Sequence, residues 1–388
     1  MKRLKMKKYF TYLKVTVPII LFFLIANLKG QVHPTHNNKR AIEFPDISGY
    51  KTLVCDFHQH TVFSDGYVWP NIRVQESLKD SVDAMAITEH LEGQPHKEDI
   101  PHPDRNRAYQ IALKEAQDKN IVVVNGAEIT RVMPPGHVNA IFLRDANKLL
   151  MDNPIDVFKE AKRQGAFIFW NHPNWIAQEP DGVAKITDLH RKLIKEKLIN
   201  GIEIVNDWTY SEEALQIAID YNLTIMGSTD IHGLIDWQYK VHEGGHRPVT
   251  LVFAKVKTAK AIKESLFNRR TAVWFCNTLI GNAEFIVPLI NASLTIEKVD
   301  TVKSYKGNSN VMSIYINNNS DADYILKNKS GYTFHNLSNV ITAKAHETTI
   351  VEIKTLKPLR EFDLRFEVLN AVTAPKKHPE IVLHAKTW

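Results

Sequence analysis

The chain has 388 residues, of which 44% are hydrophobic and 24% charged, values that are ordinary for globular proteins. Its formal net charge of +6 does not indicate nucleic-acid binding, because residues 1–30 hold seven basic residues and no acid, which leaves −1 for the rest. A chain of this length has room for two domains.

Residues 1–30 have the pattern of an export signal. A basic start precedes an apolar run from Val15 to Leu28, which is shorter than the roughly 18 apolar residues of a membrane span. The small Gly30 suggests cleavage before Gln31. The alternative is an uncleaved anchor, which would be the protein's one link to a membrane. Either way we expect an exported protein, periplasmic or secreted, with residues 31–50 as a polar linker.

Segments typical of strands and of helices alternate from residue 51 to about residue 277. The predicted strands are 53–57, 84–88, 121–125, 138–143, 166–170, 202–205, 224–226, 250–254 and 272–276. The predicted helices are 72–79, 107–119, 155–163, 189–197, 211–220 and 259–267, with Ser211 capping one start and Gly165 closing one end. This alternation favours an α/β domain of parallel strands, either a closed barrel or an open doubly wound sheet.

The pattern changes after about residue 290. Short predicted strands joined by polar turns follow at 311–316, 324–327, 349–353, 362–368 and 381–385, with no helical pattern. We therefore expect a barrel domain over 51–288 and an all-β, sandwich-like domain over 289–388. The second domain either binds a partner or glycan or has a structural role. Cys55 and Cys276 lie in apolar runs and are predicted to be buried free thiols, although a disulfide between them stays open.

Residues able to bind metal ions recur where the predicted strands end. His58 and His60 follow the first strand two positions apart, so an extended backbone would put both imidazoles on one face. Comparable positions hold Asp65, His90, Glu128, His137, His172, Asp230 and His232. Functional sites are built at the carboxyl ends of barrel strands, so these nine residues could bind two or three cations.

Together these motifs resemble those of the PHP family, named for polymerase and histidinol phosphatase domains, over about residues 51–277. They are Asp56-Phe57-His58-Gln59-His60 with Ser64-Asp65-Gly66, Thr88-Glu89-His90, Gly126-Ala127-Glu128, Gly136-His137, Asn171-His172-Pro173 and Ser228-Thr229-Asp230-Ile231-His232. One position departs from the family pattern, because Glu89 stands where an Asp is usual. We expect Glu89 to orient a metal ligand rather than to bind metal.

The resemblance implies a distorted (β/α)7 barrel with a trinuclear metal centre. It assigns His58, His60, Glu128 and Asp230 to a first metal. Glu128 would bridge to a second metal completed by His137 and His172, and Asp65, His90 and His232 would hold a third. This mixed nitrogen and oxygen set suits Zn, Mn or Fe better than Mg.

Clustered divalent ions activate water and neutralise phosphate oxygens. The predicted reaction is hydrolysis of a phosphate ester, small or polymer-linked, by a metal-bridging hydroxide. Asp65 and His232 are candidates for the group near the leaving oxygen. Arg131 is the favoured phosphate-binding cation because it follows Glu128 closely. Other candidates are Arg105, Arg107 and Arg247.

Two other functions stay open. The centre could serve a phosphodiesterase, a nuclease or another metal-assisted hydrolase, although the near-neutral charge after residue 30 argues against a nuclease. The barrel could also be a metal-stabilised binding module, although a structural metal site needs only about four ligands. Trp175, Trp208 and Trp237 follow strands of the predicted site and either wall its pocket or pack within the barrel.

Overall fold

The computed structural model describes residues 40–303 and 310–387. The predicted export signal and residues 31–39 of the predicted linker lie outside these residues. Among the described residues, no helix has the length and apolar character needed to cross a membrane.

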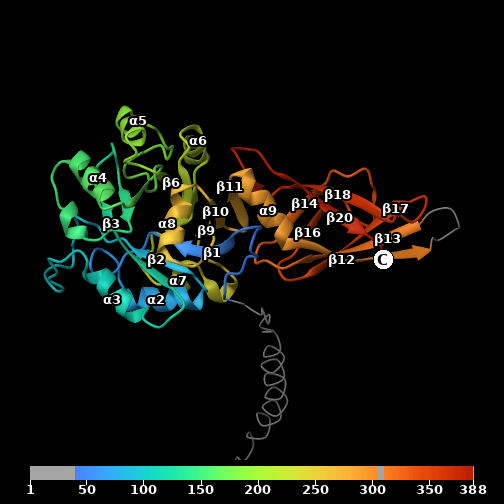
Figure 1. Cartoon of the computed structure of the whole chain (residues 1–388), viewed down its shortest axis with the longest axis horizontal. Helices are drawn as coiled ribbons and strands as arrows, with labels where there is room; N and C mark the ends of the chain where they lie inside the picture. The colour runs from blue at the N-terminus through green and yellow to red at the C-terminus, as the bar shows by residue number, and fades with distance from the viewer. Residues whose placement is uncertain (1–39, 304–309, 388) are drawn as a thin grey trace, which may run out of the picture. The chain divides into compact units, whose positions relative to one another are not determined.

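The first part of the chain is a distorted barrel of seven strands, which confirms the predicted fold class (Figure 1). Parallel pairing joins β1 to β2, β2 to β3, β5 to β6 and β6 to β8. The ring closes between β8 and β1 through a single bridge, Gln59 to Ile231. The barrel strands are β1 (Lys51–Asp56), β2 (Ala84–Ile87), β3 (Val122–Ile129), β4 (Val138–Ile141), β5 (Phe167–Trp170), β6 (Gly201–Asn206) and β8 (Thr224–Ser228).

One barrel strand does not follow the predicted parallel arrangement. β4 runs antiparallel to both β3 and β5. The chain between Ile129 and Val138 is too short for the crossover that parallel strands need, so β4 must return in the opposite direction. As a result the end of β3 and the start of β4 lie at the same end of the barrel.

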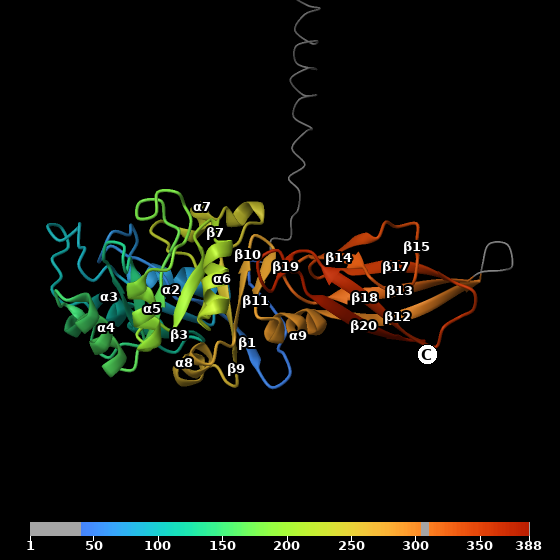
Figure 2. The ribbon, with the colours of Figure 1, turned by 90° about the horizontal axis from the view of Figure 1, so that it is seen from above.

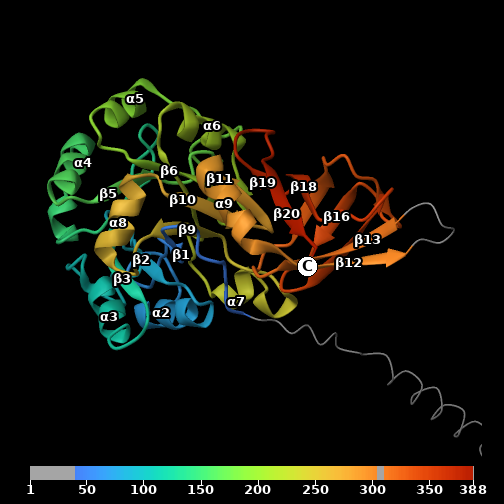
Figure 3. The same cartoon turned by 45° about the vertical axis from the view of Figure 1, so that its right-hand side comes forward.

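Helices surround the curved sheet (Figure 3). Ser211 caps α6 by accepting a hydrogen bond from the N–H of Ala214, and Gly165 follows α4 with φ of +78°, as predicted. The helices of this part are α2 (Pro70–Lys79), α3 (Arg107–Glu115), α4 (Pro154–Arg163), α5 (Asp188–Lys195), α6 (Glu212–Asp220), α7 (Ile235–Gln238) and α8 (Ala259–Phe267), with short 3₁₀ turns η1 (Ala146–Leu149) and η2 (Val241–Glu243).

Three antiparallel strands extend the sheet from β1. They are β9 (Val249–Ala254), β10 (Thr271–Phe275) and β11 (Thr278–Gly281). Cys276 and Asn277 form the tight turn between β10 and β11, both with positive φ. The predicted burial of Cys276 is therefore wrong: its thiol is exposed at the turn, Cys55 is buried, and both cysteines are free.

The chain then forms a sandwich of two four-stranded sheets, as predicted. The burial of β18 and β20 alternates residue by residue, which places one face of their sheet in a core. The sheets contain β12 (Leu294–Lys303), β13 (Asn310–Asn318), β17 (Thr348–Thr355) and β15 (Phe334–His335) in one, and β16 (Val340–Ala343), β14 (Tyr324–Asn328), β18 (Glu361–Val368) and β20 (Glu380–Lys386) in the other.

An unpredicted helix, α9 (Ala283–Ser293), leads into the sandwich and packs beside β11 and β20 (Figure 2). Pro288 lies inside this helix, where proline is destabilising because it cannot donate a backbone hydrogen bond. The burial of Phe285, Ile286, Leu289 and Ile290 must therefore stabilise the helix. The domain boundary predicted at residues 288 and 289 falls inside α9. A short strand, β19 (Ala371–Val372), pairs in parallel with β11 and joins the sandwich to the barrel sheet.

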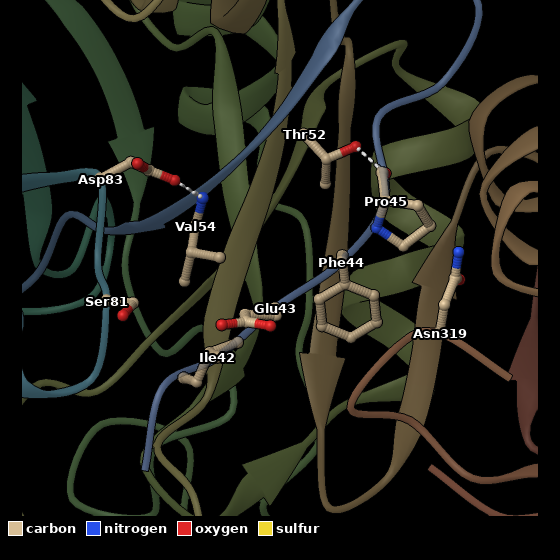
Figure 4. A pocket seen from close by; sticks show the side chains of 9 residues that line it. All are labelled: Ile42, Glu43, Phe44, Pro45, Thr52, Val54, Ser81, Asp83 and Asn319. Atoms are coloured by element: carbon tan, nitrogen blue, oxygen red, sulfur yellow. Dashed lines mark hydrogen bonds between the residues drawn. The ribbon is translucent and has the colours of Figure 1, made fainter. Parts of the chain in front are cut away.

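A cavity of about 430 Å³ lies near the start of β1. Figure 4 shows Asp83 accepting the N–H of Val54 and the hydroxyl of Thr52 donating to the carbonyl of Pro45. Asn319 lines the cavity from the sandwich side. The metal-ligand candidates follow the opposite end of β1, so this cavity is separate from them.

A buried ion-pair network ties the barrel together behind the loop that carries Asp230. The fully buried guanidinium of Arg247 lies 2.6 Å from Asp80 and 3.2 Å from Asp56. Asp56 in turn accepts hydrogen bonds from the backbone and hydroxyl of Thr229. Arg247, one of the candidate phosphate-binding cations, is therefore engaged in a structural pair.

Replacing Arg247 with Met should lower the free energy of unfolding by about 3–5 kcal/mol, because buried Asp56 would lose its cation and Asp80 would keep only Arg40. Chemical denaturation measures this loss. Arg163→Met is the matched control: Arg163 pairs with Glu160 at the surface, where an ion pair contributes at most about 1 kcal/mol. Equal losses in the two variants would contradict the assigned role of Arg247.

Candidate metal centre

The ends of the barrel strands bring all nine predicted metal ligands into one cluster. The donor atoms of His58 and His60, the two Nε2 atoms, lie 3.1 Å apart, and Asp230 Oδ1 lies 3.1 Å and 3.0 Å from them. Glu128 Oε2 lies 3.3 Å from His60 Nε2 and 2.9 Å from His90 Nδ1.

The remaining predicted ligands lie on two sides of this group. Glu128 Oε1 lies 3.0 Å from His137 Nδ1 and 3.4 Å from His172 Nε2. On the other side, Asp65 lies 3.3 Å from His90 Nε2 and 3.2 Å from His232 Nε2.

Three groups have donor atoms within 4.8 Å of one another, close enough to share an ion: His60, Asp65, His90 and His232; His58, His60 and Glu128; and His90, Glu128 and His137. These groups overlap the three ligand sets that the family resemblance implies. Which side chain binds which ion stays a prediction.

Hydrogen bonds on the far side of the rings direct free nitrogen atoms into the cluster. His58 Nδ1 lies 2.9 Å from Glu203, and His232 Nδ1 donates to the carbonyl of Asp230 at 2.7 Å. His60 Nδ1 lies 3.2 Å from the hydroxyl of Ser64, which itself donates to Glu89. Each of these rings therefore presents Nε2 to the centre, the arrangement that a metal-binding histidine requires.

Glu89 has the supporting position expected for it. It accepts hydrogen bonds from the backbone and hydroxyl of Thr61 and from Ser64, and it reaches His60 only through Ser64. The longer carboxylate at this position is thus linked to a predicted ligand through one hydroxyl group.

Glu203 is a residue of the site that was not predicted from the sequence. This residue is buried on β6, where it contacts His58 Nδ1 and accepts the backbone N–H of His172 at 2.9 Å. A signal was present, because Glu203 is an isolated acid within the apolar run of β6.

The ionised carboxylates of the cluster attract positive charge. Against burial, nearby carboxylates raise the pKa of His58 well above its usual value and that of His90 to about 11, so metal binding at these two rings would displace protons. Burial lowers the pKa of His60 to about 4, so its ring is neutral at pH 7. Burial alone would raise the pKa of Glu128, but His90 and His58 hold it well below its usual value, so the carboxylate stays ionised. The pKa of Asp230 is likewise lowered against burial, chiefly by His58.

Unsatisfied buried atoms support the fit of metal ions. Glu128 Oε2 and Asp65 Oδ1 are buried without a hydrogen bond. Glu128 Oε2 has histidine nitrogens nearby, but their geometry is not that of hydrogen bonding. A divalent cation would satisfy such converging donors, so the residues fit a metal centre.

The backbone is strained where two ligands enter the cluster. His172 and Asp230 have φ of +27° and +51°, in the left-handed region that residues other than glycine rarely occupy. Such strain persists only where the surrounding structure enforces it, and it is characteristic of functional sites.

Two other sequence-predicted residues lie outside the cluster of donor atoms. Arg131 pairs with Glu92 at 2.9 Å and donates to the carbonyl of Met151. Its binding of phosphate stays a prediction, and it would require Arg131 to exchange partners. Trp175 borders the cluster, with its ring centroid 5.4 Å and 5.2 Å from those of His137 and His172.

Known proteins resemble both parts of the chain. A family model described as an Ig-like domain matches residues 296–384. A two-domain protein from Bacteroides vulgatus, described as containing a predicted PHP-like metal-dependent phosphoesterase, is 40% identical, with a TM-score of 0.81, over 89% of this chain and 98% of its own. The chain belongs to the PHP family.

Other relatives are more distant. An uncharacterised protein of Methanocaldococcus jannaschii is 37% identical over 79 residues, which are 20% of this PHP chain and 34% of that protein. The match thus spans about a third of the curated relative. An amidohydrolase from Chromobacterium violaceum has 14% identity and a TM-score of 0.33, over 46% of this chain and 87% of its own, a likeness too weak to support an argument.

Replacing Glu128 with Ala should remove at least one of the metal ions that the wild-type chain binds, because this carboxylate contacts histidines on both sides of the cluster. Metal content per chain, measured by elemental analysis after dialysis, checks this. Glu160→Ala, in α4 and outside the cluster, is the control and should keep the wild-type content. Equal content in the two variants would exclude Glu128 as a ligand.

Replacing Glu203 with Gln should weaken metal affinity by about 10- to 100-fold, because the amide no longer holds His58 as a carboxylate does. Titration with a competing chelator measures the affinity. If Glu203→Gln bound metal as tightly as the wild type, the carboxylate of Glu203 would not be strengthening metal binding by His58.

Proposed function

We propose that this protein is an exported hydrolase that cleaves a phosphate ester at a centre of two or three divalent metal ions, of Zn, Mn or Fe. The observation that carries the proposal is the convergence of six histidines and three carboxylates on one end of the barrel. The Bacteroides relative, itself described as a predicted phosphoesterase, supports the choice of bond.

The ligand residues divide by their exposure. Asp65 and His232 have side chains that are 38% and 34% exposed, whereas those of His58, His60 and Glu128 are fully buried. A substrate arriving from solvent would therefore meet Asp65 and His232 first. This favours them as the groups that hold or move a proton at the leaving oxygen.

Metal ions bound by these residues would supply an activated water at neutral pH and would neutralise the charge on the phosphate oxygens. The protein's own contribution is to fix the ligand rings through Glu203, Ser64 and the carbonyl of Asp230. Since the donor atoms are held from behind, little reorganisation should accompany substrate binding.

Export rests on the amino-terminal sequence. Residues 1–30 combine seven basic residues with a short apolar run, the pattern of a cleaved signal. A periplasmic or secreted enzyme would act on phosphate esters available outside the cytoplasm, either small molecules or groups on a polymer.

The purified protein, supplied with Mn or Zn, should hydrolyse members of a panel of phosphate mono- and diesters. Glu128→Ala should lower the rate by about a thousandfold or more, because metal activation accounts for several kcal/mol of the barrier. Phosphate released from the monoesters and alcohol released from the diesters are measured directly, with Glu160→Ala as the control. Turnover of no ester by a metal-loaded chain would overturn the proposal.

A further inference from the structure

A tight hairpin places Asp207 and Trp208 beside the metal centre. Strands β6 and β7 (Thr209–Tyr210) pair directly, which leaves these two residues at the tip. The backbone N–H of Asp207 donates to the carbonyl of Ser228 at the end of β8. The tip is thus attached to two strands and cannot move independently of them.

The position of β6 determines what this tip faces. β6 pairs with β5 on one side and with β8 on the other. Those strands lead into His172 and Asp230, and β6 itself carries Glu203, which contacts His58. The hairpin tip therefore stands at the carboxyl end of the strand that lies between two ligand-bearing loops.

Two large aromatic side chains are partly exposed on this side of the centre. Trp208 is 49% exposed and packs one part of its ring on Tyr239, at 5.0 Å between centroids. Trp175, in the loop after β5, is 43% exposed and contacts His137 and His172. A single exposed aromatic residue is ordinary, whereas two that follow the adjacent strands β5 and β6 at their carboxyl ends offer ring faces at the end of the barrel that holds the ligand candidates.

Asp207 adds a hydrogen-bond acceptor to that surface. Its Oδ1 atom accepts from Gln238 at 2.5 Å and from Tyr239 at 3.0 Å. These bonds fix the carboxylate, and the described residues make no hydrogen bond to its other oxygen. A hydroxyl group of a bound ligand could donate to that oxygen.

Most arginines near the ligand motifs have other partners. Arg73, Arg131 and Arg247 pair with Glu76, Glu92 and Asp80 respectively, and Arg105 donates to the carbonyls of Leu91 and His102. In the proposed subsite the metal centre neutralises the phosphate, while Asp207 disfavours further negative charge. The remainder of the ligand should be uncharged.

We propose that Trp175, Asp207 and Trp208 form a subsite for a neutral sugar ring, so that the substrate is a phosphorylated carbohydrate. The apolar C–H face of a sugar would stack on an indole, and a ring hydroxyl would donate to Asp207. This inference rests on the proposed phosphoesterase function, whose substrate class it names.

The test compares kcat/KM for a hexose phosphate, a nucleoside monophosphate and glycerol phosphate, using the full chain loaded with Mn. The wild type should prefer the hexose phosphate to either of the others by about tenfold or more. Trp208→Ala and Asp207→Asn should each reduce the ratio of hexose phosphate to glycerol phosphate by about tenfold, the effect of one lost ring or hydroxyl contact. Metal content is measured in each variant to verify an intact centre.

Phe267→Ala is the matched control. Phe267 is 43% exposed, like Trp175, but it packs on Phe167 at the start of β5, the opposite end of the strand from the metal centre. In Phe267→Ala, the ratio of kcat/KM for hexose phosphate to that for glycerol phosphate should equal the wild-type ratio. A wild type without preference, a preference for the nucleotide, or an unchanged ratio in Trp208→Ala would overturn the sugar subsite.

Failure of phosphate release from every ester would reject the phosphoesterase function and leave the subsite to a binding measurement. Binding of a methyl hexoside is then measured by saturation-transfer NMR. A signal that is lost in Trp208→Ala and kept in Phe267→Ala would support the sugar subsite. The absence of a signal in the wild type would overturn it.

Discussion

Glu128 is the residue on which the organisation of the barrel end depends. It is a fully buried carboxylate, and histidines from the loops after β1, β2 and β5 and from the start of β4 lie within about 3.5 Å of it. A buried charge is costly unless opposite charge or hydrogen bonds compensate it. The centre must therefore hold cations, either metal ions or the protons of its own histidines.

The same region closes the barrel. Backbone pairing between β8 and β1 is limited to the bridge of Gln59 with Ile231 and its neighbouring bonds. Arg73 strengthens this seam by donating to the carbonyls of His60, Ile231 and His232. Ligands from both sides of the seam point to the centre, so metal ions bound there would also join the two strands. Metal binding at this cluster would thus be physically coupled to the closure of the fold.

Particular residues show how far sequence reasoning extends. The period of two in an extended strand placed His58 and His60 together, and short strand-like runs joined by polar turns predicted the sandwich strands β18 and β20, whose burial alternates. The antiparallel direction of β4 was missed, although the short connection from β3 implied it. Helix α9 was missed because its local sequence, with Pro288, opposes a helix that tertiary packing stabilises. Glu203 was missed because, in the sequence, a single acidic residue within a strand looks like any solvent-facing polar residue until its contacts are known.

The sequence by itself determined the donor set, the order of strands and helices, and the presence of a second, all-β domain. These properties follow from residue type and local periodicity, which the chain carries at each position. Only the tertiary structure decided that Glu89 reaches His60 through Ser64, that Arg247 is buried in a structural ion pair, and that Trp175 borders His137 and His172. Those facts depend on contacts between segments far apart in the chain, and such contacts form only when the whole barrel closes.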